Sequence, residues 1–357
     1  MEPEARAPEA WRQLALAAPR AWGGPLASGA IRVEAADFLV EERLGFEPDG
    51  GPAHRLLLVE KQDANTLYVA RKLAAHAGLP NSEIGFAGMK DRRAIAWQWF
   101  SVPAAKGLAS FAGFAGDGFR VLAEAPHSRK LRRGALAANR FRIRVRDLQG
   151  DTSAIEARLG RIAASGVPNY FGAQRFGKDG ANLGHVAEWI ETGRLPRARD
   201  ARSFMLSAAR ALAFNAVLGA RVGAGAWNRL LQGEIVNLSG SKSVFAAEGL
   251  DETLLGRCAG GDIGPTGPLC GSEGMQPRGE AESVEKSVLA TLEPLPTQLA
   301  AAGLRAERRA LVLRPKDMAF GLEGATLDVG FELPRGAFAT SVLREIVEVG
   351  IPEPDPD

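Results

Sequence analysis

One carboxylate stands among three cations in residues 86–93 of this chain. The segment reads Phe-Ala-Gly-Met-Lys-Asp-Arg-Arg, and Asp91 is its acidic residue. Nearby cations keep an aspartate ionised, and the ionised carboxylate is the form that acts as a nucleophile or as a base. Taken alone, the segment favours a different interpretation, a solvated charged turn before the strand-like residues 94–102. The remainder of the chain reverses that preference.

Six segments of the chain share motifs with one protein family and follow its order. They are residues 31–46 (IRVEAADFLVEERLGF), 85–100 (GFAGMKDRRAIAWQWF), 130–146 (KLRRGALAANRFRIRVR), 167–177 (VPNYFGAQRFG), 202–217 (RSFMLSAARALAFNAV) and 333–346 (LPRGAFATSVLREI). Across these segments the sequence resembles the TruD family of tRNA pseudouridine synthases. A single match would be weak, whereas six in order are specific. Residues 254–298 carry no recognisable family motif.

The resemblance implies an isomerase that converts uridine into pseudouridine. The reaction breaks the C1′–N1 bond, turns the base and joins C5 to C1′, without redox or phosphate chemistry. It needs a carboxylate near the reacting atoms, a cation that keeps it charged, and a dry slot for a flipped nucleotide. Asp91 holds the position of the family's catalytic aspartate. We therefore expect no cofactor and no metal, and the sequence leaves open whether Asp91 adds covalently or removes a proton.

Two basic residues are candidate partners of Asp91. Arg32, a second catalytic candidate, falls where the family pattern usually has a lysine, and a guanidinium stays charged and binds carboxylates well. A surface arginine on an exposed strand is the alternative. Lys90 adjoins Asp91, but neighbours along a strand point to opposite faces. We expect Lys90 to bind the substrate, and contact with a phosphate or with a structural carboxylate stays open.

Three more residues are expected to bind the substrate by resemblance. Asn139 and Phe141 belong to the motif Ala-Ala-Asn-Arg-Phe, where the amide could bond the aspartate or the uracil edge and the ring could stack on an extruded base. Phe38 is the third, and Glu42 is matched without an assigned role. From their pattern alone, core phenylalanines and a turn asparagine are the simpler interpretation.

Basic residues gather in residues 127–133, which read His-Ser-Arg-Lys-Leu-Arg-Arg. A solvated charged face is the usual explanation of such a run. Beside a site for a flipped base, phosphate contact becomes the better explanation, and four residues are expected to bind RNA: Arg129, Lys130, Arg132 and Arg133. Arg175, in residues 167–177, is a further RNA-binding candidate, although that segment could equally pack between domains.

The hydrophobic pattern predicts the elements that position these residues. Residues 140–146 alternate arginine with apolar side chains, which predicts a strand with its arginines on one outer face. Residues 67–77 repeat apolar side chains at helical spacing, with Asn65 and Thr66 as candidate caps and with Gly78 and Pro80 ending the helix. Other expected helices are 155–164, 183–191 and 202–222, other expected strands are 31–40, 56–59, 97–102, 310–313 and 326–333, and residues 256–279 are expected to be a loop.

Strands dominate before about residue 150 and after about residue 310, which favours an α+β domain split by a helical insertion. The resemblance implies a pseudouridine synthase catalytic domain with a mixed, mainly antiparallel sheet, interrupted by a mainly helical inserted (TRUD) domain. The expected parts are a loosely ordered N-terminal segment at 1–28, the catalytic domain at 29–165 and 307–357, and the inserted domain at 166–306.

Composition describes an ordinary globular protein of 357 residues, 46% hydrophobic and 24% charged. Because the net charge is only +2, any polyanion site must come from local clustering. Cys258 and Cys270 have no neighbouring histidine, which argues against zinc. The first residues lack a signal-peptide pattern and no long apolar run is present, so we expect a cytoplasmic protein outside the membrane.

The sequence thus predicts a cytoplasmic, monomeric, cofactor-free tRNA pseudouridine synthase that modifies, by resemblance, uridine 13 of tRNA. Two alternatives stay open. The enzyme could act on another RNA, such as messenger or ribosomal RNA, because RNA is read by shape and through a flipped base. A non-catalytic RNA-binding or RNA-folding protein would require the surroundings of Asp91 to be degraded, and they are intact.

Overall fold

The arginine-rich alternation forms the longest strand of a large sheet in the computed structural model, which describes residues 8–91, 93–104 and 109–350. Strand β8 (Leu136–Gly150) buries Phe141, Ile143 and Val145 and turns the arginines between them to the other face. Because side chains alternate along a strand, one face joins a core and the other meets solvent. The predicted strand and its arginine face are confirmed.

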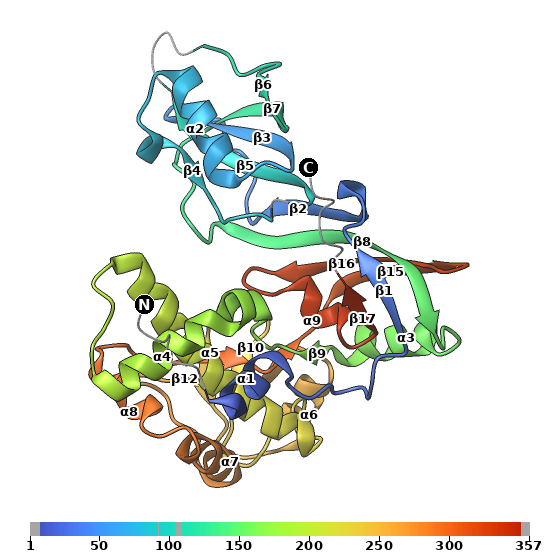
Figure 1. Cartoon of the computed structure of the whole chain (residues 1–357), viewed down its shortest axis with the longest axis vertical. Helices are drawn as coiled ribbons and strands as arrows, with labels where there is room; N and C mark the ends of the chain where they lie inside the picture. The colour runs from blue at the N-terminus through green and yellow to red at the C-terminus, as the bar shows by residue number, and fades with distance from the viewer. Residues whose placement is uncertain (1–7, 92, 105–108, 351–357) are drawn as a thin grey trace. The chain divides into compact units, whose positions relative to one another are not determined.

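Within the described residues, eleven strands form this sheet (Figure 1). Its main path runs β15–β16–β8–β2–β5–β3–β7–β6, β1 pairs with β8 and β17, and β4 pairs with β5. The strands other than β8 are β1 (Ala27–Ile31), β2 (Phe38–Leu44), β3 (His54–Gln62), β4 (Gly85–Phe86), β5 (Ile95–Pro103), β6 (Ala115–Gly116), β7 (Phe119–His127), β15 (Lys316–Glu323), β16 (Thr326–Pro334) and β17 (Val347–Gly350). The pairs β2–β5 and β1–β17 are parallel, and the other pairs are antiparallel.

Helix α2 (Thr66–Ala77) begins and ends where the sequence predicts. The side chain of Asn65 accepts a hydrogen bond from the amide of Leu67, and Gly78 ends the helix in the left-handed conformation that glycine adopts without strain. The apolar side of α2, with Val69 and Leu73 fully buried, packs on residues of β3, β5 and β7. Two short 3-10 turns, η1 (Ala35–Asp37) and η2 (Asn81–Glu83), complete this part of the chain.

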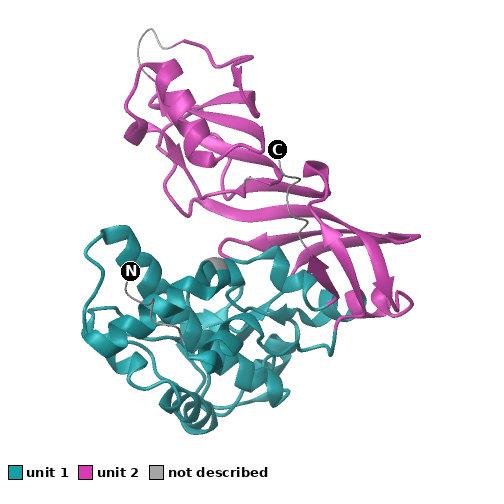
Figure 2. Ribbon diagram, in the orientation of Figure 1, with its two compact units in different colours: residues 1–24, 160–314, 337–345 teal, residues 25–159, 315–336, 346–357 magenta. Residues whose placement is uncertain are grey.

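The chain divides into two compact units (Figure 2). Unit 2 holds the large sheet and α2, from Pro25–Leu159, Pro315–Gly336 and the residues from Ile346 onward. Unit 1 holds Gly160–Arg314, Ala337–Glu345 and the residues before Pro25. The fold class, mixed α+β with a mainly antiparallel sheet, is confirmed. The domain boundaries expected at 28, 165 and 306 stay a prediction.

Unit 1 is built around helix α5 (Arg199–Gly223). This is the one described helix that is long and apolar enough to cross a membrane, but 67% of its apolar window is buried inside the protein, as in a core helix. The other elements here are α3 (Ile155–Ser165), which carries the chain from unit 2 into unit 1, β9 (Val167–Pro168), η3 (Ala173–Phe176), η4 (Lys178–Gly180), α4 (Ala181–Thr192), α6 (Glu252–Ala259), α7 (Gly279–Ala290), α8 (Leu295–Ala301), β14 (Val312–Leu313) and α9 (Ala339–Leu343). The predicted helices at 155–164, 183–191 and 202–222 are confirmed.

The loop expected at residues 256–279 is wrong in its first half. Residues up to Ala259 end α6, and β12 (Ile263–Leu269) lies between β10 (Ile235–Leu238) and β13 (Glu307–Ala310), with β11 (Val244–Ala246) beyond β10. Strand β12 contains two prolines and two glycines, which are poor strand formers, so local propensity does not predict it. Position 267 requires glycine for a structural reason, because a Cβ there would lie only 2.8 Å from Leu311 and 3.1 Å from Phe214 of α5.

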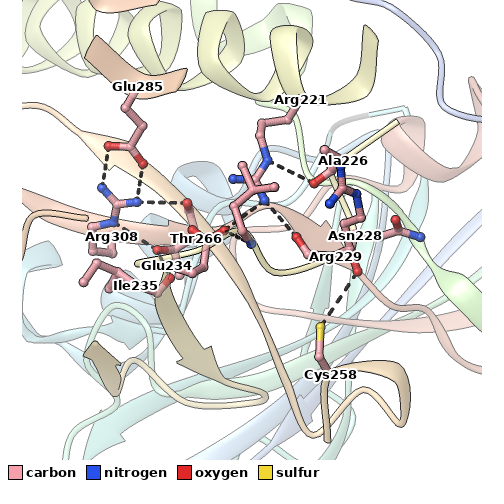
Figure 3. A network of polar contacts seen from close by, with 11 residues as sticks. Arg221, Ala226, Asn228, Arg229, Glu234, Ile235, Cys258, Thr266, Glu285 and Arg308 are labelled. Atoms are coloured by element: carbon pink, nitrogen blue, oxygen red, sulfur yellow. Dashed lines mark hydrogen bonds and ion pairs between the residues drawn. The ribbon is translucent and has the colours of Figure 1, made fainter. Parts of the chain in front are cut away.

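Buried charges join the small sheet of unit 1 to its helices (Figure 3). Arg308 on β13 donates to both carboxylate oxygens of Glu285 on α7, and its side chain and that of Glu285 are 4% and 7% exposed. Arg221 on α5 pairs with Glu234 at 2.9 Å, and burial raises the pKa of Glu234. Each charge has an opposite partner, which is the condition under which buried ions are tolerated.

The N-terminal segment differs from the expectation for residues 1–28. Helix α1 (Glu9–Leu16) packs Trp11, Leu14 and Ala15 on the core around α5, and β1 already begins at Ala27. Residues 1–7 lie outside the described residues. A sequence rich in alanine and proline does not reveal this order, because the helix is stabilised by burial against a distant part of the chain.

Candidate active site

The face of the large sheet that buries Phe141 brings the candidate substrate-binding residues together. Opposite residues of neighbouring strands share a face. In the β2–β8 register Phe38 lies opposite Ile143, and Glu42 lies opposite Asn139. Phe141 lies opposite Phe331 of β16. Residues separated by more than a hundred positions therefore meet on one surface.

Three aromatic rings form the apolar part of this surface. The centroids of Phe38 and Phe141 are 6.1 Å apart in an edge-to-face arrangement, and those of Phe141 and Phe331 are 5.8 Å apart. The exposed fractions of the three residues are 2%, 7% and 1%, so the rings form a floor and expose at most an edge. A floor of this kind can exclude water from a base placed over it.

Arg32 contacts both this floor and Asp91. Its Nη2 donates to Asp91 Oδ2 at 2.5 Å, and its guanidinium carbon lies 4.1 Å from the centroid of the Phe38 ring. The side chain of Arg32 is 10% exposed, whereas that of Asp91 is 39% exposed. Arg32 has a φ of 61°, a left-handed conformation that is uncommon for residues other than glycine and that clusters at functional sites. The sequence-derived pair is present, and its part in catalysis stays a prediction.

The loop that carries Asp91 is held by buried polar side chains. Gln98 on β5 donates to the carbonyl of Gly88 at 2.7 Å, and the amide of Lys90 donates to the hydroxyl of Thr66 at 3.1 Å. Thr66 and Gln98 also bond each other at 3.0 Å, and both residues are fully buried. Because these anchors stand on α2 and β5, the loop is positioned by regular elements.

Lys90 lies against a structural carboxylate. Its Nζ is 2.6 Å from Glu42 Oε1, and the side chains are 8% and 0% exposed. The other carboxylate oxygen of Glu42 accepts from the amide of Trp99 at 2.9 Å. Of the two roles left open for Lys90, this geometry favours the structural carboxylate, and it gives Glu42 a role in holding the loop. Substrate binding by Lys90 stays a prediction.

A second lysine, which sequence reasoning missed, supports Asp91 from below. Lys61 on β3 is 1% exposed, and its Nζ donates to the backbone carbonyls of Asp91 and Ala64 at 2.9 Å each. Burial lowers the pKa of Lys61 to about 8, while the nearby Asp91 carboxylate acts in the opposite direction. The sequence pattern could have indicated its burial, because Lys61 continues the alternation of the buried residues Leu57 and Val59 along β3.

Asn139 offers an unused acceptor on the same face. Its Oδ1 is buried and has no hydrogen-bond partner among the described residues. A buried polar atom without a partner costs free energy, and such atoms are uncommon in folded proteins. A bound group with a hydrogen-bond donor would satisfy it.

The basic cluster between β7 and β8 lies beside the segment that leads to Asp91. Lys130 Nζ donates to the carbonyl of Ser82 at 2.6 Å, and the Arg133 guanidinium lies 5.7 Å from the centroid of the Phe86 ring. Arg335, which the sequence did not single out, donates to the carbonyl of Gly134 within the cluster. The exposed members of the predicted set are Arg129, Arg132 and Arg133.

His127 and the arginines of β8 do not form one continuous basic surface with the exposed arginines of residues 129–133. His127 is 6% exposed, stacks on Phe46 and faces Asp49 at 3.1 Å, so it belongs to the interior. The arginines of β8 lie on the sheet face opposite Phe141, and Arg144 and Arg146 are paired with Asp328 and Asp37 at 2.8 Å.

Residues 167–177 are built into unit 1. Arg175 donates to the hydroxyl of Ser207 at 2.9 Å and lies 5.4 Å from the centroid of the Phe171 ring, and burial lowers its pKa. Asn215 on α5 bonds both the amide and the carbonyl of Phe171. These contacts favour packing within the unit, and RNA contact by Arg175 stays a prediction.

The described residues contain no group of three His, Cys, Asp or Glu side chains placed to hold a metal ion. Cys258 and Cys270 are buried and unpaired with each other, and burial raises the pKa of both thiols.

Comparison with known proteins agrees with this geometry. The family model described as tRNA pseudouridine synthase D (TruD) matches residues 20–202 and 198–346. A protein named tRNA pseudouridine synthase D from Xanthomonas euvesicatoria pv. vesicatoria is 45% identical over 350 residues, covering 93% of this chain and 94% of its own. One of the same name from Methylococcus capsulatus is 42% identical over 332 residues, covering 92% and 94%.

A solved structure has the same fold. A crystal structure assigned to tRNA pseudouridine synthase D (TruD) from Methanosarcina mazei aligns with a TM-score of 0.71 at 22% identity, covering 97% of this chain and 98% of that chain. Since the family model spans most of the sequence and relatives above 40% identity match 92% or 93% of it, the chain belongs to the TruD family of tRNA pseudouridine synthases, which are isomerases.

Proposed function

We propose that this protein isomerises uridine 13 of tRNA to pseudouridine and that Asp91 is the catalytic carboxylate. The observation that carries the proposal is the Asp91–Arg32 ion pair beside the aromatic floor of Phe38, Phe141 and Phe331. A half-exposed carboxylate held by a largely buried guanidinium is oriented and reachable, as a nucleophile or a base must be. Position 13 rests on the family resemblance.

The reaction is balanced within the substrate and solvent. The C1′–N1 bond of uridine breaks and a C5–C1′ bond forms, so no atom of the base is gained or lost except by proton exchange. The proton on C5 leaves, and N1 takes up a proton. Among the described residues, Arg32 is the hydrogen-bond donor to the Asp91 carboxylate and uses Oδ2, which leaves Oδ1 available for C1′ or for a proton.

The remaining candidates have roles in this scheme. Phe141 and Phe38 support the flipped base, and the free Oδ1 of Asn139 accepts the N3–H of uracil. Lys61, Thr66 and Gln98 position the Asp91 loop. On this proposal unit 2 is the catalytic domain and unit 1 the inserted domain. Cytoplasmic location and a monomeric state are parts of the same proposal that rest on the sequence.

The proposal is tested with purified protein and unmodified RNA. We expect pseudouridine at position 13 of a tRNA transcript that has uridine there, and none in the same transcript with cytidine at 13. Mapping of pseudouridine in total RNA from cells with and without the gene extends the test to messenger and ribosomal RNA. Loss confined to another RNA class would reject the tRNA assignment, and no loss in any RNA would reject the activity.

A further inference from the structure

The connection between α4 and α5 forms a strongly basic surface on unit 1. Residues 194–204 hold four arginines against one aspartate, a net charge of +3, whereas the whole chain carries only +2. The members are Arg194, Arg197, Arg199, Arg202 and the aromatic Phe204, and all five are exposed. We call this set the α4–α5 patch.

The arginines of the patch are not used for internal pairing. Two exposed arginines elsewhere on the protein do meet carboxylates: Arg144 lies 2.8 Å from Asp328, and Arg257 lies 2.6 Å from Asp262. In the described part of the chain, none of the four patch arginines forms an ion pair. Arg202 Nε donates a hydrogen bond to the carbonyl of Pro196 at 3.1 Å, which braces the connection.

The start of α5 extends beyond the core that it belongs to. Residues 199–204 are exposed on every side of the helix, and burial begins abruptly at Met205, which is 1% exposed. Phe204 is 62% exposed, the highest value among the large hydrophobic residues that the structure describes. A ring presented to solvent in a segment that holds four exposed arginines suits a partner that offers both negative charge and flat apolar faces.

We infer that the α4–α5 patch binds the RNA substrate, with its arginines on backbone phosphates and Phe204 stacked on an unpaired base. The inference rests on the proposed function for the identity of that RNA as tRNA. Arginine favours phosphate because its planar fork donates two parallel hydrogen bonds to phosphate oxygens. A membrane surface is less suited, since binding to it requires a broad apolar face and the patch offers one ring.

The charge test compares two pairs of substitutions. Arg197→Gln with Arg199→Gln removes two patch charges, and Lys242→Gln with Lys286→Gln removes two exposed charges elsewhere on unit 1. Affinity for a tRNA transcript is measured between about 50 and 200 mM salt. The patch pair should bind severalfold more weakly, and the slope of log affinity against log salt should fall by roughly 1.4–1.8, while the control pair stays close to wild type.

The stacking test uses Phe204 alone. Phe204→Tyr keeps a ring and should bind tRNA like wild type, whereas Phe204→Leu keeps apolar area without a ring and should bind about fivefold more weakly or worse. The control pair should form pseudouridine at the wild-type rate, whereas the patch variants with weaker binding should show it as a higher KM for tRNA. Thermal unfolding of each variant checks that the fold is intact.

The outcomes separate this inference from the proposed function. If the patch pair binds tRNA with the affinity and the salt slope of wild type, the inference about the patch is wrong. It is also wrong if the control pair is weakened as much as the patch pair. Both outcomes leave the proposed function intact as long as the wild-type protein forms pseudouridine. A wild-type protein without activity on tRNA, but with patch-dependent RNA binding, would overturn the proposed function and support the patch. If the patch pair loses a binding to anionic phospholipid vesicles that the wild type has, while its tRNA binding is unchanged, the assignment of the patch to RNA is wrong.

Discussion

At the scale of single residues, the site depends on one ion pair and on the groups that fix it. Asp91 is reachable from solvent, and Arg32 holds it from a buried position while stacking on Phe38. Lys61 fixes the backbone of the same aspartate. The pairing of Asp91 with Arg32 was predicted from the family motifs in the sequence. The role of Lys61 was not, because a lysine within a strand is normally assigned to solvent, and only the folded chain shows where its ammonium group ends.

Substitution of Arg32 should separate charge from shape. Arg32→Lys keeps a cation beside Asp91 and should retain activity within about tenfold, with some decrease because the stacking on Phe38 is removed. Arg32→Met keeps much of the stem and removes the charge, and should lose about 1.4 kcal/mol or more of transition-state stabilisation, which is tenfold in rate. Single-turnover rates at saturating tRNA measure both. A Met variant as fast as wild type would mean that Asp91 works without Arg32.

Substitution of Lys61 should change how stability depends on pH. The pKa of Lys61 is about 8 in the folded protein against 10.5 ordinarily, so between these values the unfolded chain binds more protons. The contribution of Lys61 to the free energy of unfolding therefore rises with pH across this window. Lys61→Met lacks this gain, and from about pH 7 to about pH 10 the wild type should gain roughly 1–3 kcal/mol more than the variant. Urea titrations at both pH values measure it, and parallel pH profiles would contradict the assignment.

At the scale of elements, local patterns predicted those whose stability is visible in their own residues. The alternation of β8 and the caps of α2 are examples, since each is set by side chains within the element. Strand β12 was missed because its prolines and glycines are poor strand formers, and the strand exists through its partners β10 and β13. Helix α1 was missed for the same reason, because it is stabilised by the core around α5.

The buried pair Glu285–Arg308 ties α7 to β13, and breaking it from one side should be costly. Glu285→Gln leaves the Arg308 guanidinium buried without a counter-charge, so the free energy of unfolding should fall by about 3 kcal/mol. The double variant Glu285→Gln with Arg308→Met removes both charges and should be less destabilised than the sum of the single changes Glu285→Gln and Arg308→Met. Urea unfolding of the four proteins gives the cycle. Strict additivity would show that the pair is not coupled.

At the scale of the whole molecule, the two units are assembled from segments that alternate along the chain. Residues 337–345 return to unit 1 between two segments of unit 2, which the order of motifs along the sequence does not predict. Each unit carries its own exposed arginines, the 129–133 cluster on unit 2 and the α4–α5 patch on unit 1. Since the net charge is only +2, RNA affinity must come from such local clusters.

The cluster on unit 2 should contribute to RNA affinity in its own right. Substitution of Arg129, Arg132 and Arg133 by Gln should lower the salt slope of tRNA binding by roughly 0.7–0.9 for each phosphate that the variant no longer neutralises. Lys130 is left in place, because it is bonded to Ser82 and its replacement would disturb the loop. A matched variant with Lys242, Lys286 and Lys316 changed to Gln controls for net charge. An unchanged slope in the first variant would show that the cluster is a solvated face.

The central claim is that Asp91 carries out the chemistry, and one comparison tests it most directly. Asp91→Asn keeps the shape of the side chain and removes its charge, and Asp117→Asn makes the same change at an exposed turn of unit 2. Pseudouridine formation and tRNA affinity are measured on one tRNA transcript for both variants and the wild type. The account predicts no product from Asp91→Asn with tRNA affinity within a few fold of wild type, and full activity from Asp117→Asn. Product formation by Asp91→Asn at more than about a thousandth of the wild-type rate would contradict it.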